Sequence, residues 1–351
     1  MEKVKLLGMN PAELKEVALE AGLPAFAGKQ LAQWLYGRKV RSIEEMTNIS
    51  KAGREKLSEK YEVGVIEPSE VFESSDGTRK YLFPVTCALS KSPGAPVESS
   101  MVEAVMIPDD DRRTLCVSSQ AGCKMGCKFC MTGRQGFHGH LSAADILSQF
   151  LAVDESAELS NAVFMGMGEP LDNYDNVMRS IEVLTADWGF AWSPKRITLS
   201  TIGVMPQLGR FLQESRCHLA VSLHDPLPEE RESIMPVQKT FPVEKVLSEI
   251  RKHDFSGQRR VSFEYTMFRG FNDDKRHADA LVRLLKGIPC RVNLIRFHKI
   301  PDFPYETSPE PVMEMFRDRL SAAGITCTIR ASRGEDIFAA CGLLAGRHDK
   351  Q

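Results

Sequence analysis

The sequence lacks any apolar run close to the roughly 18 residues that a membrane-spanning helix needs. We therefore expect no membrane contact. Residues 1–16 carry acidic side chains within their apolar stretch, so they also lack the core of a signal peptide. These two absences predict a cytoplasmic protein.

The chain has almost no net charge, because Lys+Arg number 45 and Asp+Glu number 47, which gives −2 at pH 7. This excludes a uniformly basic protein, so any nucleic-acid surface must come from local segregation of charge. Apolar residues make up 42% of the 351 residues, enough for about two domains or one α/β barrel with an appendage. The nine cysteines are odd in number, in a chain too long to need disulfide staples. Reduced thiols with chemical roles are therefore the expectation.

The first 100 residues predict a small helical unit followed by a linker. Helical patterns cover residues 11–22, 27–39 and 42–61, and the first has Asn10 as its cap and Pro11 at its first position. Residues 23–60 hold eight Lys/Arg and four acids. A helical bundle with a solvated face explains this composition most simply, and an RNA-docking module is the alternative. Residues 88–100 are rich in Pro, Ser and Gly and indicate a linker.

From about residue 101, strand-like and helical runs alternate. Seven apolar strand-like runs begin with EAVMIP and TLCVSS and end with RVNLIRF, and amphipathic helical runs separate most of them. This alternation predicts βα units around a parallel sheet, either covered on both faces or curled into a barrel. A further helix over 309–324 and a strand over 325–331 follow.

Three cysteines share the spacing CxxxCxxC: Cys123, Cys127 and Cys130. They follow the run TLCVSS in a Gly-rich loop, and thiolates suit either zinc or an iron–sulfur cluster. Three ligands would leave one iron of a 4Fe–4S cluster open, whereas zinc would need a fourth ligand such as His138 or His140. Residues 112–140 contain five Lys/Arg and no acid, a positive field that favours a reduced anionic cluster or an RNA phosphate.

This cysteine motif resembles that of the radical S-adenosylmethionine (SAM) superfamily. The further motifs FMGMGEPLDN, ITLSTIG, VSLHDP, VNLIRF and RGEDIFAACG occur in order along most of the chain and resemble the RlmN/Cfr family of RNA adenine methyltransferases. The resemblance implies an α/β fold in which residues 101–300 form a partial (βα)6 radical-SAM barrel. It also implies an N-terminal helical RNA-binding domain with its linker at 1–100, and a C-terminal extension at 301–351.

The resemblance implies one 4Fe–4S cluster on Cys123, Cys127 and Cys130, with SAM bound beside it. The residues that it assigns to the SAM pocket are Gly168, Glu169, Ser200, Ser222, Leu223, His224 and Asn293. Most of them end predicted strands, which is where (βα) barrels carry their sites, although Asn293 lies early in its strand. Taken alone, the Gly168-Glu169 segment is equally compatible with an ordinary strand-to-helix turn, and His224 with a structural histidine.

The resemblance also gives roles to two cysteines outside the motif and to one acid. Cys341 would accept a methyl group from one SAM, and a radical from a second SAM would activate that methyl for addition to adenine C2. Cys116 would then remove the C2 proton and form a transient disulfide with Cys341. Glu103 matches the assigned proton acceptor, although by itself it is a carboxylate on a predicted edge strand. Four cysteines match no motif and are expected in the core: Cys87, Cys217, Cys290 and Cys327.

The implied function is methylation of adenine C2 in 23S rRNA, at the peptidyl transferase centre, and in tRNA next to the anticodon. The expected partners are these RNAs and an electron donor such as flavodoxin, and we expect a monomer. Residues 275–299, with seven Lys/Arg and one acid, could add to an RNA-binding rim, or form a solvated helix face. Two alternatives stay open: a C8-methylating member of the same family, and a zinc-stabilised RNA-binding protein without catalysis.

Overall fold

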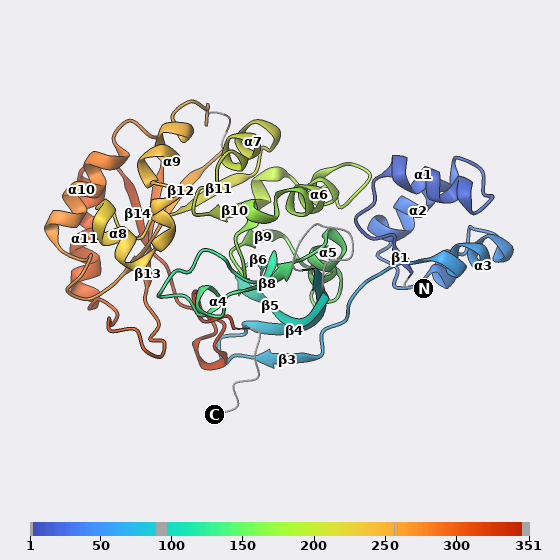
Figure 1. Ribbon diagram of the computed structural model, residues 1–351, viewed down its shortest axis with the longest axis horizontal. Helices are drawn as coiled ribbons and strands as arrows, with labels where there is room; N and C mark the ends of the chain where they lie inside the picture. The colour runs from blue at the N-terminus through green and yellow to red at the C-terminus, as the bar shows by residue number, and fades with distance from the viewer. Residues whose placement is uncertain (1–2, 89–96, 256, 258, 346–351) are drawn as a thin grey trace.

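The computed structural model describes residues 3–345 apart from 89–96, 256 and 258. One twisted sheet dominates the molecule, and its main part consists of seven parallel strands (Figure 1). In spatial order these are β6 (Arg112–Cys116), β9 (Asn161–Phe164), β10 (Ile197–Thr201), β11 (His218–Ser222), β12 (Val261–Met267), β13 (Arg291–Arg296) and β14 (Thr326–Ile329). Every neighbouring pair in this series is parallel.

Helices cover the outer face of these strands. They are α5 (Ala143–Leu151), α6 (Tyr174–Thr185), α7 (Gln207–Glu214), α8 (Pro228–Ile234), α9 (Val243–Ile250), α10 (Lys275–Leu285) and α11 (Glu310–Ala322). Each turns an apolar stripe towards the sheet, as Leu281 and Leu285 of α10 illustrate, since both are almost fully buried. The six strands β6 to β13 are each followed by helix before the next parallel strand, so the predicted partial (βα)6 barrel is confirmed.

Antiparallel strands extend the sheet beyond β6. β5 (Val97–Asp109) pairs with β6, and β4 (Arg79–Ala88) and β3 (Glu70–Glu73) follow. β8 (Phe137–His140) and β7 (Gln120–Gly122) form a hairpin that joins β4. The expected domain limit at residue 100 therefore falls inside β5, and the limit at 300 separates β13 from α11 and β14 of the same sheet. Most of the expected linker, residues 89–96, lies outside the described residues.

The N-terminal unit is helical, as expected, but its helices are shorter than the sequence pattern indicates. α1 (Pro11–Glu20) is capped by Asn10, whose side chain accepts hydrogen bonds from two backbone amides of the first turn. α2 (Ala27–Ala32) continues as a π-helical turn over Gln33–Gly37, and a 3-10 turn at Ile43–Glu45 precedes α3 (Lys51–Lys60). A short parallel pair, β1 (Val4–Lys5) with β2 (Tyr61–Glu62), closes the unit.

Ion pairs join this N-terminal unit to the outer helices of the barrel. Lys5 Nζ lies 2.8 Å from a carboxylate oxygen of Asp145 on α5, and Arg179 of α6 contacts Glu13 of α1 at 3.0 Å. In Figure 1 the unit accordingly lies at one end of the molecule, beside α5 and α6. Among the described residues, no helix is long and apolar enough to cross a membrane.

Candidate active site

The loop between β7 and β8 carries the three motif cysteines. Cys123 follows β7 directly, and its amide donates a hydrogen bond to the Gly136 carbonyl at 2.8 Å. Gly122 has a φ of +70°, and a Cβ there would lie 2.0 Å from the same carbonyl oxygen. Only glycine can therefore occupy this position, and the tight hairpin fixes where Cys123 emerges from the sheet.

The second half of the loop is fixed by contacts to two other segments. Cys130 precedes the short helix α4 (Met131–Arg134), and its amide donates to the Cys127 carbonyl at 3.2 Å. The amide of Lys128 donates to the carbonyl of Ile234 at the end of α8, at 2.9 Å. As a result, all three thiols line one cavity of about 160 Å³.

The chemistry of these thiols suits a cationic, thiophilic group. Burial, together with the neighbouring Cys130, raises the pKa of Cys127 to about 12. Burial likewise raises the pKa values of Cys123 and Cys130. Because each thiolate disfavours ionisation of the next, a bound metal group is needed to hold all three as thiolates. Three converging cysteines fit a 4Fe–4S cluster with one iron left open.

The zinc alternative required a fourth ligand from His138 or His140. Neither lines the cavity among the described residues. His140 instead hydrogen-bonds Gln120 through Nδ1 at 3.2 Å and packs edge-on against Phe137. The geometry therefore disfavours zinc in the form that the sequence suggested.

The ends of β9, β10 and β11 bring most of the expected SAM pocket to the same cavity. The residues that line it are Gly168, Glu169, Ser200, Ser222 and His224. The Glu169 carboxylate accepts hydrogen bonds from Thr201 Oγ1 at 2.6 Å and from the amide of Ile202 at 3.0 Å. Burial nevertheless raises the pKa of Glu169 to about 7, because it outweighs these hydrogen bonds.

His224 lies beside the cluster loop in the left-handed region, with a φ of +57°. Its Nδ1 accepts a hydrogen bond from the Thr266 amide at 3.0 Å, and its ring packs against Phe129 at 4.9 Å between centroids. Burial, together with the nearby Arg231, lowers the pKa of His224 to about 3. The imidazole is therefore neutral, with Nε2–H as its donor.

Two expected pocket residues do not line the cavity. Leu223 is fully buried, and its amide donates to the Glu264 carbonyl at 3.1 Å. Asn293 donates through Nδ2 to Glu264 Oε1 at 2.8 Å. Both therefore contact Glu264, which does line the cavity.

Glu264 and Arg330 are cavity residues that the sequence analysis missed. Arg330 Nη1 lies 3.4 Å from Glu264 Oε2, and the carboxylate is almost entirely buried. An acid within the otherwise apolar run VSFEYTMF was a signal for Glu264, since a buried charge needs a partner. Nothing local marked Arg330, which comes from the segment after β14.

Cys341 lies in the C-terminal extension and lines the cavity with the motif cysteines. The segment around it is tied to the cluster loop: the Met131 amide donates to the Gly342 carbonyl at 2.8 Å, and Thr132 Oγ1 donates to the Leu344 carbonyl at 2.7 Å. Cys341 is exposed.

Cys116 lies at the end of β6, close to Cys341. Burial and the nearby Cys341 raise the pKa of Cys116 to about 12, although Arg330 opposes them. All nine cysteines are free, so the structure holds no disulfide between Cys116 and Cys341. Of the four cysteines without a motif, Cys87, Cys217 and Cys327 are buried and Cys290 is partly buried.

Glu103 was expected on an edge strand, but β5 pairs on both sides, with β4 and β6. Its buried carboxylate contacts Lys80 Nζ at 3.3 Å and accepts a hydrogen bond from the Ala345 amide at 3.0 Å. In the antiparallel register, Val105 opposes Cys116, so Glu103 shares that face of the sheet one step along. Glu103 does not line the cavity among the described residues.

A second pocket of about 270 Å³ reaches Cys341 from the outside. It shares Arg330, Ile295 and Cys341 with the inner cavity. Its other cationic residues are Arg112, Arg296 and Arg333, with His298 beside them. Cys341 therefore lies where the thiol-lined cavity meets a pocket lined by four arginines, of which Arg112 is paired with Asp109.

Comparisons with known proteins agree with this geometry. Residues 117–281 match the family model of the radical SAM superfamily, and residues 4–63 match that of the ribosomal RNA large subunit methyltransferase N-terminal domain. The chain is 61% identical to a probable dual-specificity RNA methyltransferase RlmN of Porphyromonas gingivalis, over 98% of this chain and 94% of the relative. It is 38% identical to the dual-specificity RNA methyltransferase RlmN of Syntrophus aciditrophicus, over 99% and 98%. A crystal structure of a radical SAM methyltransferase from Sphaerobacter thermophilus is similar at a TM-score of 0.89 and 34% identity, over 98% of this chain and all of the other.

Proposed function

The chain belongs to the RlmN family of radical SAM methyltransferases, and we propose that it methylates adenine C2 in 23S rRNA and in tRNA next to the anticodon. The observation that carries this proposal is the meeting of three partly buried thiols and Cys341 at one cavity that adjoins an arginine-lined pocket. A 4Fe–4S cluster and SAM bound there would supply the radical that removes a hydrogen atom from a methyl group.

The inner cavity would bind the cofactors. Cys123, Cys127 and Cys130 would hold the cluster as thiolates. Glu169 would accept hydrogen bonds from the amino group of SAM, and neutral His224 would donate through Nε2. Ser200 and Ser222 would add hydroxyl groups, while Leu223 and Asn293 would act by holding Glu264 in place.

Cys341 would carry the methyl group. Its thiol would lose a proton and take the methyl group of one SAM, which would leave as S-adenosylhomocysteine. After loss of a hydrogen atom, the methylene carbon would form a bond to adenine C2, and the adduct would carry one unpaired electron. Cys116 would take the C2 proton and its sulfur would then bond to the Cys341 sulfur as the sulfur–carbon bond breaks. The methylene carbon would gain a proton to become the methyl group, and the surplus electron would return to the cluster that supplied one for SAM cleavage. The products would be methylated RNA and a Cys116–Cys341 disulfide, which a reductant must reopen.

Glu103 would be a secondary proton acceptor. Its place on the same face as Cys116 supports this role, because a proton could pass along that face. The contact to Ala345 also gives it a structural role at the base of the extension.

The outer pocket would receive the target adenosine. An adenine must leave its stack before C2 is accessible, and the pocket presents Cys341 at its base. The guanidinium groups of Arg112 and Arg333 at its rim suit the flanking phosphates. The interior of the barrel is thus reserved for the cofactors, and the RNA would need to insert only one base.

Incubation with SAM carrying a fully deuterated methyl group, followed by mass analysis of RNA nucleosides, tests the proposal. The expected product is 2-methyladenosine whose methyl group holds two deuterium atoms and one hydrogen, because one deuterium leaves with the radical. The Cys341→Ala variant should keep its iron and make no product. Methylation at C8 would assign the chain to the C8 branch, and methylation by Cys341→Ala would contradict the two-cysteine mechanism.

A further inference from the structure

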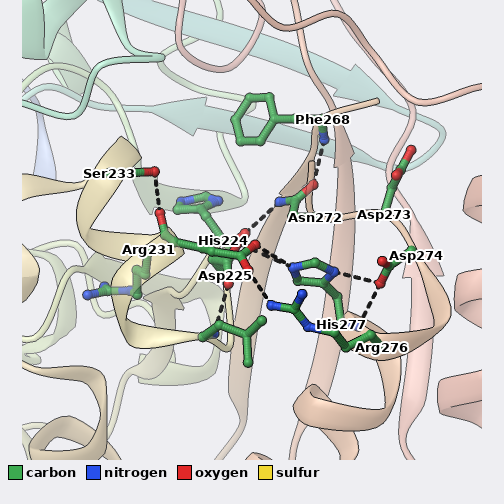
Figure 2. Close-up of polar contacts among 12 residues, drawn as sticks. His224, Asp225, Arg231, Ser233, Phe268, Asn272, Asp273, Asp274, Arg276 and His277 are labelled. Atoms are coloured by element: carbon green, nitrogen blue, oxygen red, sulfur yellow. Dashed lines mark hydrogen bonds and ion pairs between the residues drawn. The ribbon is translucent and has the colours of Figure 1, made fainter. Parts of the chain in front are cut away.

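A cluster of ionisable side chains lies just outside the SAM cavity and has no part in the mechanism above. Asp225 follows His224 in the loop after β11, Glu230 lies on α8 and His277 lies in the first turn of α10. One donor atom from each of the three lies within 4.8 Å of the other two. Figure 2 shows the His277 ring between Asp274 and the loop that carries His224 and Asp225.

Asp225 has an unsatisfied carboxylate oxygen. The residue is fully buried, and its Oδ1 accepts a hydrogen bond from the Leu227 amide at 2.8 Å. Its Oδ2 is buried and finds no hydrogen-bond partner in the described part of the chain. Burying a carboxylate oxygen without a hydrogen-bond donor raises the free energy of the folded state. A cation bound to this oxygen would remove that penalty. His277 Nε2 lies 4.0 Å from this oxygen, which is beyond hydrogen-bond distance.

His277 is held as metal-binding histidines usually are. Its Nδ1 lies 2.7 Å from Asp274 Oδ1, the outer carboxylate contact that orients an imidazole and makes its other nitrogen more basic. Nε2 then faces Glu230 Oε2 at 2.8 Å and the unpartnered oxygen of Asp225. The ring is 2% exposed.

We propose that Asp225, Glu230 and His277 bind a zinc ion, with water as the fourth ligand. One imidazole nitrogen and two carboxylate oxygens form a donor set that zinc accepts. Ligand atoms about 2.0 to 2.2 Å from zinc lie roughly 3.3 to 3.6 Å apart in a tetrahedron, so small side-chain shifts would complete the site. Zinc would replace the Nε2 proton of His277, which is released to solvent.

The contacts of Glu230 are compatible with this ion. Glu230 pairs with Arg276 through Oε1, so its Oε2 is the oxygen that turns towards His277. The Glu230 side chain is 28% exposed, which gives an ion and its water a path from solvent. The ion would link α10 to the end of β11 and the loop after it, which carry Ser222 and His224. Its role would be to position the SAM cavity, since none of the three ligands lines that cavity.

Metal analysis of the cluster-loaded protein tests the proposal without relying on activity. Anaerobically reconstituted protein is dialysed against Zn²⁺, and zinc and iron are counted in the same sample. We expect about one zinc and about four irons per chain, so that retained iron excludes zinc at the motif cysteines. Asp225→Asn should lose zinc affinity by at least about tenfold, and Asp274→Asn should weaken it by about tenfold.

Two variants make the outcome decisive. Asp225→Asn keeps the side-chain shape and the contact to the Leu227 amide, so it should fold with its iron intact. His253→Gln is the matched control, because His253 also contacts a carboxylate, Glu249 at 3.3 Å, but lies outside the cluster. Zinc at the Asp225 site should also appear as anomalous scattering in crystals. Wild-type protein without zinc, or equal zinc on Asp225→Asn, would overturn the proposal.

Discussion

The carboxyl group of Glu169 is 3% exposed in the cavity, yet it accepts three hydrogen bonds. Burial favours its neutral form and the hydrogen bonds favour its charged form, and the resulting pKa is about 7. Because the two forms of Glu169 are nearly equal in free energy near pH 7, a charged ligand beside the carboxyl group changes its protonation state strongly. A SAM amino group beside it would favour the carboxylate, so that binding of SAM and loss of the proton are coupled.

We therefore expect SAM affinity to rise between pH 6 and pH 8. Below pH 7 Glu169 is mostly neutral, and binding must first remove its proton; above pH 7 the carboxylate is already present. Glu169→Gln should remove this slope and weaken binding at pH 8 by about tenfold, the usual worth of a hydrogen bond to a charged group. Equilibrium dialysis with labelled SAM measures both effects. Glu182→Gln, on the exposed face of α6, is the control. If SAM affinity rose equally with pH in the Glu169→Gln protein, Glu169 would not be the group that titrates.

Arg330 lies close to both Cys116 and Cys341, and both thiols help to raise the pKa of its guanidinium group. Burial and the nearby Cys341 raise the pKa of Cys116, and Arg330 is the charged group that opposes them. In Arg330→Gln the pKa of Cys116 should rise further, because that opposing charge is lost. Methyl transfer should then slow by about tenfold and its pH profile should move to higher pH, while SAM cleavage continues. Arg317→Gln, on the exposed face of α11, should change neither rate; slower SAM cleavage in Arg330→Gln would instead place Arg330 in cofactor binding.

The residues that the family resemblance assigns to the site include nine of the 23 residues that line the cavity, because those nine emerge from short segments whose direction the fold determines. Glu169, Ser200 and Ser222 follow this rule. Asn293 and Glu264 show its limit: they oppose each other on β13 and β12, and only the register decides that Glu264 reaches the cavity. Register depends on packing across the whole sheet, which a single sequence does not reveal.

Among the local elements, the β7–β8 hairpin has the strictest sequence requirement. Gly122 and Gly136 both have positive φ, at +70° and +81°. They differ in the room available for a side chain. A Cβ on Gly122 would lie 2.0 Å from the Gly136 carbonyl oxygen, whereas a Cβ on Gly136 would have no atom within 4 Å. The two positions therefore separate the effect of backbone strain from that of a clash.

Gly122→Ala should open the hairpin and displace Cys123. We expect a loss of about 3 kcal/mol in stability and of most of the cluster iron after reconstitution. Gly136→Ala carries the strain of positive φ without the clash and should cost only about 1 kcal/mol. Iron content and thermal unfolding of both variants, compared with the wild type, check this. Full iron loading in Gly122→Ala would mean that the hairpin does not position Cys123.

The regular elements of the barrel were predicted well, and the N-terminal helices less so. β11, for example, has a continuous apolar stretch, Leu219–Val221, that burial in a covered sheet explains. The pattern over 42–61 predicted one helix, whereas the chain forms a 3-10 turn at Ile43–Glu45 and then α3. Ser50 starts α3 because its hydroxyl accepts from the Gly53 amide, and such a cap competes with helix continuation.

At the scale of the whole molecule, the C-terminal extension connects the two ends of the sheet. It leaves β14 at one end and reaches α4 and the β3–β4 turn at the other (Figure 1). Asp336 accepts from Ser74 Oγ at 2.5 Å and from the Ser75 amide at 3.0 Å, and Asp76 accepts from the Gly334 amide at 3.1 Å. These contacts hold the segment on one side of Cys341, and α4 holds it on the other.

The position of Cys341 should therefore depend on the contacts of Asp336. In Asp336→Ala the segment loses both bonds to the β3–β4 turn, and hydrogen exchange of residues 334–345 should increase. Methyl transfer should fall by about tenfold, because a misplaced methyl carrier loses its attack geometry. Iron content and SAM cleavage should persist, since the motif cysteines keep their own hairpin. Asp318→Ala removes an exposed acid on α11 and should change none of these quantities. Unchanged exchange in Asp336→Ala, with methyl transfer intact, would show that the contacts of α4 alone position Cys341.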